Sequence, residues 1–213
     1  MNEKELAAIS LHELTQLTTY CLNVLSCTDE LRGNENLKDA YEQEKTLEGS
    51  IRKLKIASLM EKRTLICVSG MQGAGKTTMI KNFYGLKTEN LNICLGRGER
   101  IPVMITEKDI QEPLMQASVI ERGENGTYTV TDREMEPEEF AKASAGGDGS
   151  ILYLELCVPY RHLYNSGVSF VLLPGFEKKN DYWKTLIEFA VNSSDAAIFV
   201  FDESSFSQAD NYE

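Results

Sequence analysis

The stretch Gly70-Met-Gln-Gly-Ala-Gly-Lys-Thr77 decides the fold, because it is a complete G-x-x-x-x-G-K-[ST] motif. The apolar run 64–68 precedes this motif, and the run 78–83 after it can continue as a helix. A glycine loop between a strand and a helix presents backbone N–H groups and the positive end of the helix dipole to phosphate oxygens. The sequence therefore predicts a phosphate-binding loop in an α/β domain of the P-loop nucleoside-triphosphatase type.

Each position of this loop has a predicted role. The backbone N–H groups of residues 73–78 are expected to surround the α- and β-phosphates of a nucleotide. Lys76 can reach the β- and γ-phosphates, and the hydroxyl of Thr77 can ligate Mg²⁺. The predicted nucleotide-binding residues within the loop are Gly70, Gln72, Gly73, Ala74, Gly75, Lys76, Thr77 and Thr78.

Composition narrows the range of partners. The 213 residues suffice for one α/β domain with a helical appendage, and 42% of them are hydrophobic. The net charge of −11 argues against nucleic acid as a partner, because phosphate backbones require a basic surface. The same charge disfavours electrostatic docking of this chain on anionic lipid.

The remaining reactive residue types do not form a known catalytic pattern. No pair among the cysteines forms C-x-x-C, and buried free thiols in a reducing compartment fit best. We expect the two histidines to be surface or capping residues. No secretory signal and no run of about 18 apolar residues is present, so we expect a cytoplasmic protein. The cysteines are Cys21, Cys27, Cys67, Cys94 and Cys157, and the histidines are His12 and His162.

The first 62 residues are predicted to form two amphipathic helices. Apolar residues three or four apart indicate helices over 3–28 and 35–62, which suggests an αα-hairpin or part of a bundle. We therefore expect a helical segment over 1–62, followed by a nucleotide-binding domain over 63–213. A basic cluster near the end of the second helix is most simply a solvated helix face, formed by Arg52, Lys53, Lys55, Lys62 and Arg63.

The second domain is predicted to contain a mostly parallel sheet with flanking helices. After the loop, a helix over 77–84 should end at Gly85, and further helices are expected over 133–142 and 183–191. The strand over 196–201 is continuously apolar, which is typical of a buried central strand. The other strands are expected at 64–69, 101–106, 151–158 and 168–173.

The chain resembles dynamin-type GTPases, and its N-terminal helices resemble the bundle segment of bacterial dynamin-like proteins. The resemblance rests on the run Gly70 to Gly85 with its Asn-Phe-Tyr-Gly end, on Val168-Ser-Phe-Val-Leu-Leu-Pro-Gly175, and on the segment 194–210. It covers roughly residues 64–213. It implies a GTPase with GTP or GDP and Mg²⁺ as ligands, in which Gln72 orients the attacking water and acts with Lys76, and Gly175 presents its N–H to the γ-phosphate.

The resemblance also implies partners. Proteins of this family associate with themselves by pairing GTPase domains across the nucleotide, which implies a homodimer or a higher assembly. They act on membranes through a distal helical region, which would lie outside this chain. The expected location is thus the cytoplasm, with peripheral binding to a membrane.

The sequence departs from the family pattern at three places. The magnesium-linked aspartate of the family falls on Leu172, and its switch threonine falls near Glu99, with Thr106 as a poorly spaced substitute. The guanine-reading motif does not occur before Glu213, so we expect these residues to be the N-terminal part of a longer protein. We therefore expect nucleotide binding rather than fast hydrolysis, and the sequence itself does not decide between guanine and adenine as the base.

Two alternatives remain from the sequence. The strand 197–201 ends in Asp202-Glu203, which has the form of a Walker B element of P-loop ATPases. In that case Asp202 would hold the shell of Mg²⁺, and Glu203 would polarise the attacking water. The other alternative is a nucleotide sensor that changes conformation on binding and hydrolyses little.

Overall fold

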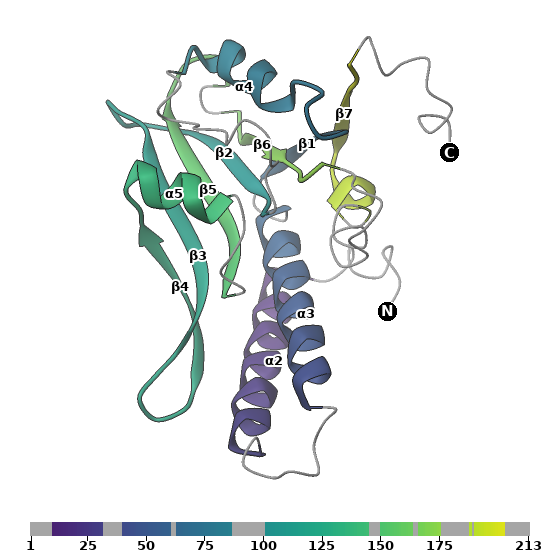
Figure 1. The fold of residues 1–213 in the computed structure, drawn as a ribbon, viewed down its shortest axis with the longest axis vertical. Helices are drawn as coiled ribbons and strands as arrows, with labels where there is room; N and C mark the ends of the chain where they lie inside the picture. The colour runs from purple at the N-terminus through teal and green to yellow at the C-terminus, as the bar shows by residue number, and fades with distance from the viewer. Residues whose placement is uncertain are drawn as a thin grey trace.

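One sheet of seven strands organises the described part of the chain (Figure 1). The computed structural model describes residues 10–31, 40–60, 63–86, 101–144, 150–163, 166–175, 188 and 190–202. The strands are β1 (Thr64–Gly70), β2 (Val103–Lys108), β3 (Leu114–Arg122), β4 (Tyr128–Glu134), β5 (Ile151–Pro159), β6 (Val168–Leu172) and β7 (Ala196–Val200). Their order in the sheet is β4-β3-β5-β2-β6-β1-β7.

The sheet is mixed: the pairs around β1 are parallel, and the remaining strands form one parallel pair and three antiparallel pairs. β1 pairs in parallel with β6 and with β7, and β2 pairs in parallel with β5. The pairs β2–β6, β3–β4 and β3–β5 are antiparallel. The carboxyl ends of β1, β6 and β7 therefore lie at one edge of the sheet, where an α/β fold places its ligands. The α/β class and the strands predicted around β1, β5, β6 and β7 are confirmed.

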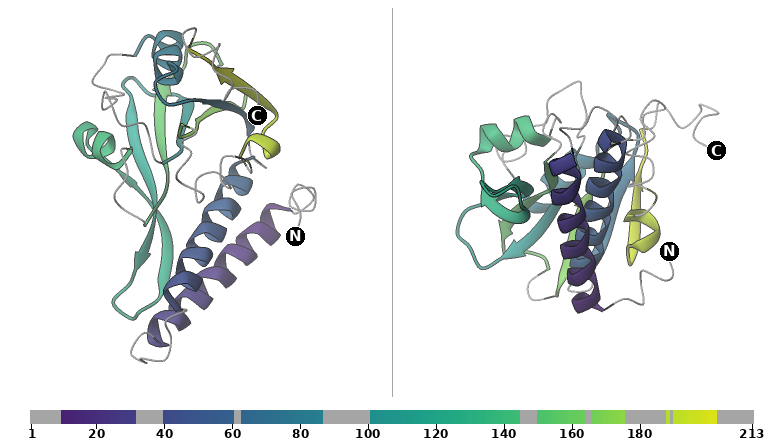
Figure 2. Two further views of the ribbon diagram at one scale, coloured as in Figure 1. Left: turned by 45° about the vertical axis from the view of Figure 1, so that its right-hand side comes forward. Right: turned by 90° about the horizontal axis from the view of Figure 1, so that it is seen from below.

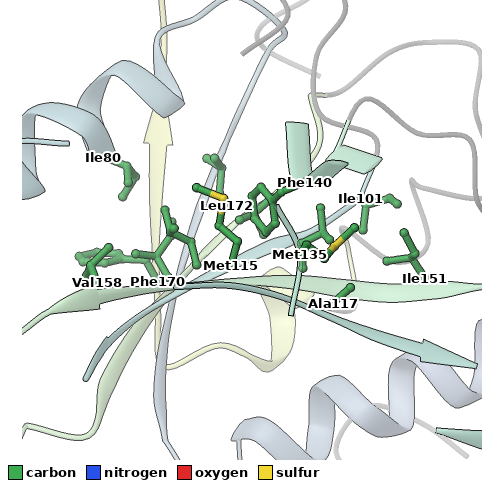
Figure 3. Close-up of a cluster of buried hydrophobic side chains, with 14 of the residues drawn as sticks. Ile80, Ile101, Met115, Ala117, Met135, Phe140, Ile151, Val158, Phe170 and Leu172 are labelled. Carbon is green, nitrogen blue, oxygen red and sulfur yellow. The ribbon is translucent and has the colours of Figure 1, made fainter. Parts of the chain in front are cut away.

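Helices α4 (Lys76–Tyr84) and α5 (Pro137–Ser144) contribute to a buried cluster on one face of the sheet, here called the α4 face. Ile80 and Phe140 pack there against the strand residues Met115, Phe170 and Leu172 (Figure 3). As predicted, Gly85 ends α4 with φ of 62°, and its N–H donates to the carbonyl oxygen of Lys81.

Helices α2 (Leu11–Leu31) and α3 (Ala40–Met60) form the predicted antiparallel hairpin and pack on the other face, here called the hairpin face (Figure 2). Leu25 and Ile51 are fully buried there against residues of β1, β2, β5 and β6. Helix α2 begins at Leu11 behind a capping box, in which Ser10 N donates to Glu13 Oε2 at 2.9 Å and Glu13 N donates to Ser10 Oγ at 3.4 Å. Residues 3–9 of the predicted first helix lie outside the described residues, and the boundary at residue 62 stays a prediction.

The prediction of a solvated basic face was wrong for Arg52. Arg52 is only 4% exposed. Its Nε donates to the carbonyl oxygen of Leu152 at 2.9 Å, and its Nη2 donates to that of Ile151 at 2.8 Å. The guanidinium therefore crosses from α3 to the first two residues of β5, because these carbonyls are acceptors that it can reach without leaving the interior.

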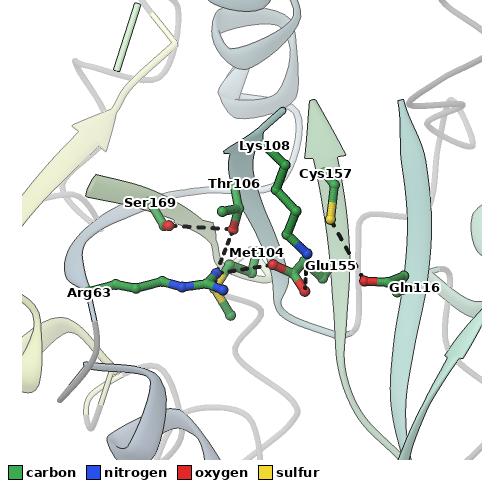
Figure 4. Close-up of polar contacts among 8 residues, drawn as sticks. All are labelled: Arg63, Met104, Thr106, Lys108, Gln116, Glu155, Cys157 and Ser169. Atoms are coloured by element: carbon green, nitrogen blue, oxygen red, sulfur yellow. Dashed lines mark hydrogen bonds and ion pairs between the residues drawn. The ribbon is translucent and has the colours of Figure 1, made fainter. Parts of the chain in front are cut away.

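The same prediction was wrong for Arg63, which is half-buried on the hairpin face (Figure 4). Its Nη1 donates to Thr106 Oγ1 at 2.8 Å and to Glu155 Oε1 at 3.0 Å. Lys108 Nζ approaches Glu155 Oε2 at 3.6 Å. One carboxylate on β5 thus holds two cations, and Arg63 connects the end of the helical hairpin to β2 and β5. Lys62 lies outside the described residues.

The region 107–150 was only partly predicted. It forms the hairpin β3–β4, followed by α5, where a helix was expected over 133–142. Residues 133 and 134 complete β4, and the helix begins at Pro137, where the missing N–H of proline is tolerated. Many residues of β4 are exposed, so its apolar pattern is weak. The predicted helix over 183–191 is described only at residues 188, 190 and 191.

The prediction that residues 196–201 form a buried central strand was wrong within the described residues. There, β7 pairs with β1 alone and is the edge of the sheet. Phe199 is 47% exposed and Phe201 is 48% exposed. A continuous apolar run shows that a strand can be buried on both faces, but it does not show which neighbours cover it.

Candidate functional site

The predicted phosphate-binding loop joins the carboxyl end of β1 to the first residue of α4. Gly70 pairs with Val200 of β7 and has φ of 143°, a conformation that residues with a side chain rarely adopt. A Cβ at this position would overlap the carbonyl oxygen of Val200. The chain can therefore leave β1 in this direction, this close to β7, only with glycine at position 70.

Lys76 lies at the start of α4, and its ammonium group turns back over the loop. Its Nζ donates to the carbonyl oxygens of Gly70 and Met71, both at 2.9 Å. The residue is only 4% exposed, so this cation is held inside the loop rather than in bulk solvent. A buried ammonium group surrounded by carbonyl oxygens adds positive charge at the position where the loop would meet phosphate.

The start of α4 suits an anion. The residue that caps the helix is Gly75, with φ of 94°, and as a glycine it offers no side chain to cap the first turn. Gly73 also has a positive φ of 80°, and added Cβ atoms at Gly73 and Gly75 would meet nothing within 4 Å. The first turn of a helix carries N–H groups without partners inside the helix. These residues therefore fit phosphate oxygens, which would accept hydrogen bonds from that turn.

Gly175 lies directly against the loop, although it is 100 positions from Gly75 in the sequence. A Cβ on Gly175 would lie 2.8 Å from the backbone nitrogen of Gln72 and 2.9 Å from its Cα. Leu173 N donates to the carbonyl oxygen of Val68 at 3.0 Å, which keeps the end of β6 beside β1. The structure thus brings Gln72 and Gly175 together. Within the loop and the first turn of α4, Gln72, Gly73 and Thr78 are exposed, whereas Thr77 is buried.

Leu172 and Thr106 occupy positions that matter for Mg²⁺. Leu172 has no exposed surface, and it belongs to the buried cluster of the α4 face. Thr106 pairs with Ser169, which in turn pairs with Leu65 near the start of β1. Thr106 therefore lies near the edge of the sheet that is opposite the loop 70–77. Its hydroxyl also accepts a hydrogen bond from Arg63. Thr106 is therefore not placed to replace a switch threonine, and Glu99 lies outside the described residues.

No described residues form a protein cage for a metal ion, since no group of three or more His, Cys, Asp or Glu side chains converges among them. Mg²⁺ needs few protein ligands, because it keeps several waters and takes oxygens from the phosphates of a nucleotide. Thr77, buried at the start of α4, is the residue in the described loop whose hydroxyl fits that role.

Asp202 follows the strand on the other side of β1. Val200, the last residue of β7, pairs with Gly70, so Asp202 lies near the same edge of the sheet as the loop. Asp202 is exposed, and Glu203 lies outside the described residues. The position of Asp202 is therefore compatible with the alternative in which an aspartate serves the nucleotide site.

The carboxyl end of α4 is held by a loop that the sequence did not single out, residues 160–163. His162 Nε2 donates to the carbonyl oxygen of Phe83 at 2.8 Å, and Arg161 Nη1 donates to that of Tyr84. His162 is thus a capping residue, as predicted. Glu107 on β2 accepts from the backbone N–H groups of residues 161, 162 and 163, each at 2.9 Å. No pattern in the sequence indicates these contacts, because they join segments more than fifty residues apart.

The thiols of Cys67 and Cys157 are buried. Burial raises the pKa of the Cys67 thiol, which donates to the carbonyl oxygen of Ala190 at 3.2 Å, and burial also raises the pKa of Cys157. Cys27 is exposed, and Cys94 lies outside the described residues. No helix in the described ranges is long and apolar enough to cross a membrane.

Comparison with known proteins gives similarity only at the level of solved structures. No family model matches the chain, and no curated protein matches it. Two solved structures belong to an oligomerised bacterial dynamin pair that provides a mechanism for long-range sensing and tethering of membranes. They are bacterial dynamins, the family that the sequence resembles.

These similarities are partial. The first structure has a TM-score of 0.47 and 17% identity, and the match covers 72% of this chain and 23% of that one. The second has a TM-score of 0.46 and 15% identity, with 78% and 26% covered. This chain therefore spans about a quarter of the length of each.

Proposed function

We propose that this chain binds a guanine nucleotide through residues 70–78 and belongs to a dynamin-like GTPase. The observation that supports this proposal most is the loop between β1 and α4, in which Lys76 Nζ is buried against the carbonyl oxygens of Gly70 and Met71. A strand, a glycine loop and a helix that begins with Lys-Thr form an arrangement in which backbone and lysine together neutralise phosphate charge.

In this proposal the residues of the loop have separate roles in binding the phosphates, ligating Mg²⁺ and positioning the attacking water. The N–H groups of residues 73–78 bind the α- and β-phosphates, and Lys76 moves from the carbonyl oxygens to the β- and γ-phosphates. Thr77 ligates Mg²⁺, which neutralises charge on the phosphates when it is bound. Gln72 positions a water for in-line attack, and the N–H of Gly175, which lies against Gln72, donates to the γ-phosphate.

We further propose that hydrolysis is slow. The side chain of Leu172 is fully buried and cannot hold the water shell of a metal ion. Thr106, the candidate substitute for a switch threonine, lies at the opposite edge of the sheet. The chain thus keeps the groups that bind phosphates and lacks, among its described residues, two groups that would speed their transfer. A nucleotide sensor with little turnover is the limiting form of this proposal.

An ATPase that uses Asp202 remains the second candidate. The observation that favours it is the parallel pairing of β7 with β1, which brings the end of β7 beside Gly70. Asp202 would then hold the shell of Mg²⁺, and Glu203 would polarise the attacking water. The buried Leu172 is compatible with this candidate, because the metal-linked acid would come from β7 rather than from β6.

Self-association and peripheral binding to a membrane, in the cytoplasm, are also part of the proposal. They follow from the family resemblance, and the two similar solved structures come from an oligomerised pair that tethers membranes. We propose that nucleotide binding promotes pairing of two copies across the loop, and that a region outside this chain contacts lipid.

Calorimetric titration of the full-length protein with GTP and with ATP, each with and without Mg²⁺, tests the proposal. The variant Lys76→Ala removes the cation of the loop, and Lys81→Ala removes a lysine from the same helix outside the motif as the matched control. We expect GTP to bind more tightly than ATP, with binding lost in Lys76→Ala and kept in Lys81→Ala.

Phosphate release measured in the same samples separates a slow enzyme from a sensor. Tighter binding of Mg·ATP, weakened by Asp202→Asn, would move the assignment to the ATPase. A protein that binds neither nucleotide would contradict both candidates.

A further inference from the structure

The carboxyl end of α4 is fastened to the sheet by a chain of contacts that starts at Glu107. Glu107 lies on β2, is only 8% exposed and faces the α4 side of the sheet near Tyr84. Its Oε2 accepts from the N–H of Arg161, and its Oε1 accepts from the N–H groups of His162 and Leu163, all at 2.9 Å. A carboxylate that accepts three backbone hydrogen bonds fixes the path of the 160–163 loop.

The loop in turn closes the end of α4. Arg161 and His162 donate to the carbonyl oxygens of Tyr84 and Phe83, two acceptors that α4 itself leaves unpaired. The His162 ring also lies on Phe83, with 4.6 Å between the ring centroids. Arg161 passes so close to the helix end that a Cβ on Gly85 would overlap its guanidinium.

The contacts of the 160–163 loop fix the carboxyl end of α4, and the continuous helix connects that end to Lys76 and Thr77. The helix has nine residues, which corresponds to a length of about 13 Å. Lys76 and Thr77 form its first turn, and Phe83 and Tyr84 form its last. A rigid helix of this length transmits a tilt at one end directly to the other, and binding groups must be held within about 0.5 Å of their working geometry.

We propose that Glu107 is a positioning residue for the nucleotide site, which it serves by holding the 160–163 loop against α4 and so orienting Lys76 and Thr77. This inference rests on the proposed function, because it assigns a role in binding the same phosphates. It adds a residue from the opposite edge of the sheet that contacts neither the loop 70–77 nor a nucleotide bound there.

Glu155 provides a matched control. It is also a partly buried glutamate with charged partners, on the neighbouring strand β5, but it faces the hairpin side, where it pairs with Arg63 and Lys108. Glu107→Gln and Glu155→Gln in the full-length protein thus remove one buried negative charge each from opposite faces of one sheet. Only the first should reach α4.

Two readouts are compared at a temperature where both variants are folded. We expect the amides of residues 79–84 to exchange with deuterium roughly tenfold faster in Glu107→Gln, and Mg·GTP to bind it roughly tenfold more weakly, while Glu155→Gln leaves both unchanged. Unchanged exchange and affinity in a folded Glu107→Gln protein would overturn the proposal, as would equal changes in the two variants.

Arg161 gives a second route if Glu107→Gln does not fold. Arg161 is exposed, so Arg161→Ala should fold, loosen α4 and weaken binding, and Arg161→Lys should restore part of both because it keeps a cation at the helix end. The same effect from Arg133→Ala, an exposed arginine that pairs with Glu139, would contradict a specific role. If the protein without substitutions binds no nucleotide, the proposed function fails. In that case the amide exchange rates of residues 79–84 still test whether Glu107 holds α4 in place.

Discussion

The two faces of the sheet are held to their helices in different ways. On the α4 face, a glycine loop and helix caps fix α4, and polar groups meet mainly its ends. On the hairpin face, Arg52 reaches through the interior to the backbone of β5, and Arg63 meets a carboxylate on the same strand. The first arrangement depends on local backbone geometry, whereas the second depends on long side chains that connect distant segments.

This difference explains which parts of the structure could be predicted. The residue spacing around Gly70, Gly75 and Gly85 requires particular backbone conformations, so β1, the loop and α4 could be predicted from the sequence. The destination of Arg52 could not, because an arginine on a helix with other basic residues has the same local pattern whether it meets solvent or a strand. Glu107 was missed for a similar reason, because a glutamate in a strand has the same local pattern whether it meets solvent or the backbone of a distant loop.

Other misses have related causes. The strand β4 is largely exposed, and its apolar alternation is limited to Tyr128 and Val130, which is too short for a strand prediction. The run 196–201 was correctly predicted as a strand but wrongly as buried, since burial of β7 depends on neighbours that the run itself does not specify. Among the predicted site residues, Gly175 lies against Gln72 of the loop, and the roles of residues 70–78 and Gly175 remain proposals.

The strongest way to break the α4 face is Gly70→Ala. The added methyl group would overlap the carbonyl oxygen of Val200 and would require an unfavourable φ, so we expect a loss of about 3 kcal/mol in the free energy of unfolding. Urea unfolding of the full-length protein measures this loss. Gly126→Ala is the matched control, because Gly126 also has a positive φ, of 78°, but open surroundings. Equal losses in the two variants would contradict the close approach of β7.

The hairpin face should be broken most by Arg52→Met. The variant leaves the carbonyl oxygens of Ile151 and Leu152 without this donor in the interior, which should cost about 2 kcal/mol of unfolding free energy. Lys53→Met, at the next and more exposed position of α3, should cost far less. The affinity of folded Arg52→Met for nucleotide should stay unchanged, since Arg52 contacts the hairpin side of the sheet. A large loss of nucleotide affinity in the folded variant would contradict this separation, because it would show that the hairpin face also determines binding at the loop.

The buried thiols of Cys67 and Cys157 should make the free energy of unfolding depend on pH at alkaline values. Burial raises the pKa of both, so the unfolded chain loses these protons first as pH rises. Stability should therefore be constant below about pH 8.5 and fall by roughly 1 kcal/mol toward pH 9.5. The double variant Cys67→Ala/Cys157→Ala should show a flatter dependence of the urea midpoint on pH. Alkylation at neutral pH should modify the exposed Cys27 first, and rapid modification of Cys67 would show that the hairpin face opens.

The smallest effect is expected for Tyr84→Phe on the α4 face. The hydroxyl of Tyr84 is buried and makes no hydrogen bond in the structure. Removal of a buried polar group without a partner is nearly neutral, so the free energy of unfolding should change by about 0.5 kcal/mol or less, in either direction. Thermal unfolding of the variant checks this. A clear loss of stability would mean that the hydroxyl has a bonded water or another partner, which would make this end of α4 more polar than described.

In the proposed function, a nucleotide binds on the α4 side of the sheet, at the loop after β1. Hydrogen exchange of the full-length protein with and without Mg·GDP tests this claim most directly, because it locates the ligand by residue. We predict slower exchange at amides within 71–80, with little change along α3 at residues 40–60. Unchanged exchange at 71–80 under saturating nucleotide, or protection confined to α2 and α3, would contradict it.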